Sequence, residues 1–187
     1  SRSQQFDRLE CTMSQQGKER IRAFGTFARQ PEKPFETRQE AAAPDIAPFE
    51  ECIAMPEMPR YTLFERMDVR LDPACAGWLS GHPTDVSEQR GWICFKDDRS
   101  SDIYSVLLMA DSFPPPVLAS HGMVAWVPTI EFSISIRDLP GSRRLKGIFR
   151  TRFIHRGILE EDGELWDENG RLIAISRQIA QFRKGGT

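Results

Sequence analysis

Residues 101–116 read SDIYSVLLMADSFPPP, and this stretch decides the fold. Apolar residues recur at helical spacing over 103–110, and Asp102 stands where a residue would cap the first turn. The three prolines that follow forbid continuation of the helix. Because the remaining side of the helix is apolar as well, the pattern predicts a short helix that is buried nearly all round.

Strands are expected on both sides of this helix. The stretches that read as strands are 63–71, 90–96, 129–139, 145–155, 157–166 and 171–183. The four after the helix follow in close order, and Asp-Glu-Asn-Gly at 167–170 is typical of a hairpin turn. One buried helix against an antiparallel meander is an α+β layer arrangement, in which the helix lies across the sheet.

The first sixty residues differ in character from the rest. Residues 6–30 read as two strands around a turn, and such a hairpin needs a larger sheet to be stable. The stretch 31–59 contains six prolines and no sustained apolar period, which indicates a linker running over a surface. A few apolar residues inside it are expected to hold it against the fold: Phe35, Ile46, Phe49, Ile53 and Met55.

Composition excludes several classes of function. The 187 residues carry a net charge of -2, which gives no surplus of positive charge for nucleic acid or anionic lipid. No apolar run approaches the length of a membrane helix, and no secretory signal is visible. Four cysteines and three histidines lack the spacing of a metal site, so we expect reduced thiols and a cytoplasmic protein. The missing initiator Met suggests processing or a natural beginning upstream.

Three motifs carry a family resemblance. Asp111–Pro114, Val127–Ser133 and Gly163–Gln178 resemble the C-terminal half of acyl-CoA thioesterase II (TesB-like) proteins of the thioesterase-like superfamily. The resemblance covers residues 61–183. Residues 1–30 look like the last strands of the family's first unit, with its Arg-Ser and Gln-x-Gly-Lys pattern.

The resemblance implies a tandem hotdog fold, in which a long antiparallel sheet wraps around a central helix in each unit. Residues 1–30 would be the C-terminal strands of a first unit, 31–60 a Pro-rich linker, and 61–187 a second, complete unit. The opening strands and helix of the first unit are not in this sequence, so we expect a missing N-terminal segment of the same protein. Open sheet edges also favour a homo-oligomer.

The family activates a water with three residues, which correspond here to Asp111, Thr129 and Gln178. A carboxylate can accept the water's proton, while a hydroxyl and an amide hold its oxygen in line with the thioester carbon. Without the resemblance each residue has an ordinary interpretation. Asp111 would form an Asx turn, Thr129 would reflect β propensity, and Gln178 would make a structural hydrogen bond.

Strict alternation places Thr129 and Glu131 on the face opposite Ile130 and Phe132. Reaching Asp111 therefore requires a β-bulge or a site between two hotdog units, and we expect the latter. Glu131 is a rival general base on the same face, although a solvated strand carboxylate is the commoner outcome.

The resemblance implies hydrolysis of acyl-CoA to free acid and CoA, in fatty acid metabolism, without metal or redox cofactor. No G-x-S-x-G elbow occurs, and His121 does not fit the hydratase spacing. Arg143, Arg144 and Lys146 could bind the phosphates of CoA or form a solvated turn. The alternative function is a non-catalytic hotdog module that binds acyl groups or holds an oligomer together.

Overall fold

The computed structural model describes residues 6–28, 36–58, 61–123 and 125–184, and the chain divides into two compact units, 1–39 and 40–187. In the first unit, β1 (Phe6–Gln15) pairs antiparallel with β2 (Lys18–Ala28). Gln16 and Gly17 in the connecting turn both have positive φ, as a tight two-residue hairpin turn requires. The predicted N-terminal hairpin is therefore confirmed.

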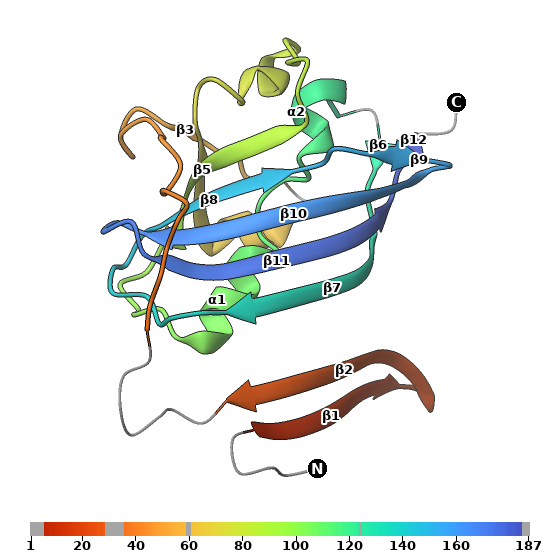
Figure 1. Cartoon of the computed structure of the whole chain (residues 1–187). Coiled ribbons are helices and arrows are strands. Elements are labelled where there is room, and N and C mark those ends of the chain that lie inside the picture. The colour runs from red at the N-terminus through yellow and green to blue at the C-terminus, as the bar shows by residue number, and fades with distance from the viewer. Residues whose placement is uncertain (1–5, 29–35, 59–60, 124, 185–187) are drawn as a thin grey trace. The chain divides into compact units, whose positions relative to one another are not determined.

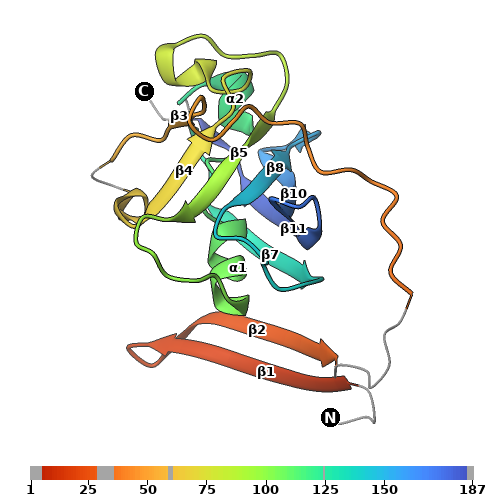
Figure 2. The same cartoon turned by 90° about the vertical axis from the view of Figure 1, so that its left-hand side faces the viewer.

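The second unit contains a long antiparallel sheet with the strand order β3-β4-β5-β8-β10-β11-β7 (Figures 1 and 2). A short strand, β9, pairs with β10 off this path, and β6 pairs with β12 separately. The bounds are β3 Ile53–Ala54, β4 Met67–Leu71, β5 Glu88–Phe95, β6 Ala125–Trp126, β7 Thr129–Ile136, β8 Leu145–Arg150, β9 Ile154–His155, β10 Ile158–Asp167, β11 Leu172–Gln181 and β12 Arg183–Lys184.

Helix α1 (Ile103–Ala110) packs against β7, β10 and β11, as the sequence predicts. Asp102 and Ser105 form a capping box at its start, with Ser105 N donating to Asp102 Oδ1 at 2.8 Å. The prediction of burial all round is wrong. Val106 and Met109 are fully buried, whereas Tyr104 is 76% exposed, because the sheet covers one side of the helix.

Other boundaries differ from the predicted ones. The expected strand 63–71 begins at Met67, and its first half is the 3-10 helix η1 (Thr62–Glu65), which buries Phe64. A second helix, α2 (Val117–His121), starts directly after the prolines, where the sequence indicates a loop. The expected strand 145–155 is interrupted because the N–H groups of Arg152 and Phe153 donate to the Glu160 side chain.

Both α1 and α2 lie on one face of the sheet, and the chain from residue 40 crosses the other (Figure 1). On that second face Ile46, Phe49 and Cys52 pack against Trp92, whose indole N–H donates to Ala47 O at 2.9 Å. The second compact unit thus includes part of the Pro-rich segment, which supplies β3. Ile53 is exposed, Met55 is buried, and Phe35 lies outside the described residues.

The core beneath α1 depends on two glycines. A Cβ at Gly147 would lie 2.7 Å from the Phe113 ring, and one at Gly163 would meet the Phe149 ring. Their bare backbone leaves room for Phe113 and Phe149, whose ring centroids lie 4.7 Å apart. This pair anchors the chain just beyond α1.

Within the described ranges, no helix has the length and apolar character to cross a membrane.

Candidate active site

Asp111 is the C-terminal cap of α1, and the turn around it is well fixed. Its backbone N–H donates to Leu108 O at 3.1 Å, and the Ser112 hydroxyl donates to the same carbonyl. Phe113 then enters the core against Phe149. These contacts hold the Asp111 carboxylate at the end of the helix.

Thr129 reaches the same place through a β-bulge. In the β7–β11 pairing Glu131 is opposite Ile179 and Thr129 is opposite Ala180, so Ile130 is one extra residue. The bulge turns Thr129 onto the face that carries Gln178. The expectation of a site between two hotdog units is therefore wrong for these three side chains, since one unit brings them together.

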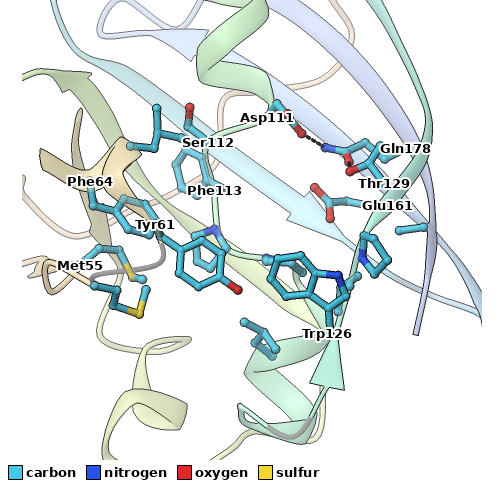
Figure 3. A pocket seen from close by; sticks show the side chains of 18 of the residues that line it. Met55, Tyr61, Phe64, Asp111, Ser112, Phe113, Trp126, Thr129, Glu161 and Gln178 are labelled. Carbon is cyan, nitrogen blue, oxygen red and sulfur yellow. Dashed lines mark hydrogen bonds between the residues drawn. The ribbon is translucent and has the colours of Figure 1, made fainter. Parts of the chain in front are cut away.

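The three side chains form a directed chain of hydrogen bonds (Figure 3). The Thr129 hydroxyl donates to Gln178 Oε1 at 2.8 Å, and Gln178 Nε2 donates to Asp111 Oδ1 at 2.8 Å. The hydroxyl is thus bonded to the amide and the amide to the carboxylate, whereas the sequence predicts that both groups hold the attacking water. Asp111 is exposed as a residue, but partial desolvation of its carboxyl group raises its pKa, and the bond from Gln178 opposes that shift.

This chain of hydrogen bonds lies at the wall of a cavity of about 290 Å³ (Figure 3). Most of the wall is apolar or aromatic, as in sites that bind apolar ligands. Its apolar members include Met55, Leu63, Phe64, Trp78, Phe113, Leu118, Trp126, Val127 and Ala180. The Tyr61 and Trp126 rings, with centroids 6.1 Å apart, also line it. The cavity can enclose an apolar group next to Asp111.

Sequence analysis missed Glu161, which also lines the cavity. It lies on β10 directly opposite Gln178 of β11 and is only 6% exposed. Burial and, secondarily, the charge of Asp111 raise the pKa of Glu161 to about 8. The signal was present in the sequence, because alternation puts Glu161 on the same face as Leu159 and Leu165.

The remaining candidates are placed elsewhere. Arg143 pairs with Asp98 at 2.7 Å, the Arg144 guanidinium stacks on Phe49, and Lys146 lies over the Trp92 ring. None of the three cations lines the cavity, and nothing in the structure tests their predicted binding of CoA phosphates, which stays a prediction. Glu131, the rival base, is exposed on β7 and is also absent from the cavity wall.

Comparison with protein families gives one clear result. The family model for the acyl-CoA thioesterase C-terminal domain matches residues 29–182, which is most of the chain. No curated protein sequence matches.

Solved structures with the same fold span more than this chain. A putative thioesterase II from Thermobifida fusca is 24% identical with a TM-score of 0.85, over 98% of this chain and 70% of its own. A hot dog fold protein of unknown function from Alicyclobacillus acidocaldarius has 19% identity and a TM-score of 0.87, over 100% of this chain and 70% of its own. An acyl-CoA thioesterase II, TesB2, from Mycobacterium marinum has 18% identity and a TM-score of 0.73, over 100% and 72%. These similarities establish the hotdog fold.

Proposed function

The chain belongs to the acyl-CoA thioesterase C-terminal domain family, and from this premise we propose that it hydrolyses acyl-CoA through a water activated by Asp111. The products are the free acid and CoA. One observation carries the proposal: the hydrogen-bonded chain Thr129–Gln178–Asp111 ends on a carboxylate at the wall of an apolar cavity.

The direction of the hydrogen bonds assigns a role to each group. An ionised carboxylate can only accept, so Asp111 fixes Gln178 with Nε2 toward it, and Oε1 is left to accept from the Thr129 hydroxyl. The bond from Nε2 favours the ionised form of Asp111 against its partial desolvation. The second carboxylate oxygen can then accept a proton from water, and Asp111 acts as the general base. Thr129 and Gln178 are positioning residues in this mechanism.

The reaction needs no covalent intermediate. The water oxygen attacks the thioester carbon while its proton passes to Asp111, and the tetrahedral intermediate collapses with cleavage of the C–S bond. The proton on Asp111 then passes to the departing thiolate sulfur, which regenerates the carboxylate. The apolar cavity takes the acyl group and removes water that would compete with the fixed hydrogen bonds.

The tandem organisation is part of the proposal. Residues 1–30 are the last strands of a first hotdog unit, 31–60 connect the two and add β3 to the sheet of the second, and 61–187 form the rest of the second. The β1–β2 hairpin supports this, because two strands alone leave Leu9 and Phe24 exposed and such ribbons are marginal in water. The remaining elements of the first unit, on a segment of the same protein, or another copy in a homo-oligomer would cover them.

The hydrogen-bonded chain predicts coupled effects of Thr129 and Gln178. Gln178→Ala is expected to lower kcat about 10- to 100-fold, because a hydrogen bond to a charged group contributes about 1.5–3 kcal/mol. Thr129→Val should cost less, and it should cost almost nothing further once Gln178 is Ala, since Thr129 acts through the amide. Steady-state kinetics of both single variants and the double variant measure this coupling.

A matched control is Ser133→Ala, which removes an exposed hydroxyl from the same strand and should leave kcat unchanged. Additive losses for Thr129→Val and Gln178→Ala would contradict the directed chain and would assign Thr129 a separate contact with substrate.

Hydrolysis over a series of acyl-CoA chain lengths tests the function itself. We expect release of free acid, detected by mass spectrometry, with one chain length preferred by the cavity. Thiol detection is less suitable, because Cys11 is an exposed free thiol. Acyl-CoA binding at every length with no turnover above the uncatalysed rate would instead identify a non-catalytic acyl-binding module.

A further inference from the structure

Glu161 is a buried carboxyl group that the mechanism above does not use. Its side chain projects into the cavity next to Thr129 and Gln178 (Figure 3). Within the described part of the chain, no hydrogen bond reaches its carboxyl oxygens. A buried carboxylate without a protein donor is costly, which favours a protonated Glu161 or a donor that enters the cavity.

The charges around Glu161 decide between these states. From the end of α1 it faces Asp111, from β11 the neutral Gln178 and from β7 the neutral Thr129. On the neighbouring strand β8, Arg150 is paired in register with Asp162 and bonds to Glu88, on the other face of the sheet. The described cavity wall contains no Lys, Arg or His, and its remaining titratable group is the Tyr61 phenol.

Burial without a cation nearby favours the protonated form of a carboxyl group, and the charge of Asp111 adds to this preference at Glu161. Asp111 accepts a hydrogen bond from Gln178, which favours its ionised form. Glu161 accepts none from the described residues and is the more deeply buried, and its pKa is raised to about 8. Glu161 therefore holds a proton at neutral pH, while Asp111 stays ionised. Environments that separate two carboxyl groups in this way assign acid and base roles.

We propose that Glu161 is the acid partner of Asp111, and that its O–H donates a hydrogen bond to the thioester carbonyl oxygen as water attacks. This inference rests on the proposed thioester hydrolysis. Attack places negative charge on that oxygen, which needs a donor. The Thr129 hydroxyl is engaged with Gln178, and one N–H of Gln178 with Asp111. Glu161 keeps its proton throughout, so the proton balance of the hydrolysis is unchanged.

Two substitutions distinguish the effect of the Glu161 hydrogen-bond donor from the effect of its side-chain volume. Glu161→Gln keeps a neutral hydrogen-bond donor, whereas Glu161→Leu keeps the approximate size and removes it. Glu161→Leu is expected to lower kcat about 100-fold or more at neutral pH, with a smaller change in KM, because loss of one such donor has that effect. Glu161→Gln should retain most of the activity. Glu131→Leu, on the exposed edge strand, is the control and should match the wild type.

The pH profile gives a second readout that a structural role would not change. Below pH about 8 Glu161 holds its proton, and kcat/KM stays high down to the pH at which the Asp111 base becomes protonated. As the pH rises through about 8 the donor is lost, and kcat/KM of the wild type should fall. Glu161→Gln has no proton to lose there, so its alkaline decline should disappear. A wild-type decline that persists unchanged in Glu161→Gln would overturn the proposal.

Infrared titration of the resting protein distinguishes failure of this inference from failure of the proposed function, because it needs no turnover. The wild type at pH 7 should show the carbonyl band of a buried protonated carboxyl group, absent from Glu161→Gln. Absence of this band in the wild type, or full kcat in Glu161→Leu, would refute the acid role. If the band is present and Asp111→Asn retains full activity, the base assignment fails instead.

Discussion

Asp111→Asn is expected to lower kcat for acyl-CoA hydrolysis about 100- to 10,000-fold, the usual loss for a general base. The substitution removes the proton acceptor but keeps the size of the side chain and an oxygen that can accept from Gln178 Nε2. It should not destabilise the fold, because Asp111 is exposed as a residue and the neutral amide is no costlier to desolvate than the carboxylate. Steady-state kinetics at saturating acyl-CoA, with a thermal unfolding curve, measure both effects.

Glu131→Gln is the matched control for this substitution. It makes the same chemical change two residues from Thr129, on a carboxylate that is exposed and does not line the cavity. It should leave kcat unchanged. Full turnover in Asp111→Asn together with a dead Glu131→Gln would move the base to Glu131 and overturn the mechanism.

Phe149→Ala is expected to lower the free energy of unfolding by about 3–5 kcal/mol, the usual cost of removing a buried Phe side chain. Phe149 is 0% exposed, and its ring fills the space that Gly147 and Gly163 leave. Neither glycine can close the resulting cavity, because neither has a side chain. The substitution also removes the partner of Phe113, which anchors the turn after Asp111. Urea unfolding followed by tryptophan fluorescence measures the loss.

Phe153→Ala provides the comparison, since Phe153 lies three residues beyond β8 and is 72% exposed. It should change the free energy of unfolding by no more than about 0.5 kcal/mol. Equal losses for the two variants would mean that the Phe113–Phe149 contact does not hold the core together.

The sequence alone was sufficient to predict the elements in which apolar residues recur at a regular spacing over a long stretch. Helix α1 and the strands β10 and β11 follow directly from such spacing. The exposed side of α1 was not predictable. The sequence shows that Tyr104 and its neighbours on the helix surface are largely apolar, but it does not show whether other elements pack against that side of the helix. Segment η1 was mistaken for a strand, since the adjacent apolar residues Leu63 and Phe64 fit either geometry and the alternating stretch 67–71 follows them.

The candidate site, too, was predictable from the sequence only in part. Family motifs identify Asp111, Thr129 and Gln178, and the structure brings their side chains into one hydrogen-bonded chain. The sequence indicates a β-bulge as one of two ways for Thr129 to reach Asp111, but the choice between them depends on the strand pairing, which the sequence does not contain. The alternation of β10 places Glu161 on the face that is turned to the core. Its proposed role depends on Asp111, which is distant in sequence but close in space.

A single turnover in ¹⁸O-labelled water, with the protein in excess over acyl-CoA, distinguishes direct attack by water from an acyl-enzyme intermediate. If a water bound to Asp111 attacks the thioester, every acid molecule formed in the first turnover carries one oxygen from the solvent. Unlabelled acid in that turnover, with ¹⁸O later found in the carboxyl group of Asp111 or Glu161, would show an acyl-enzyme intermediate and contradict the account.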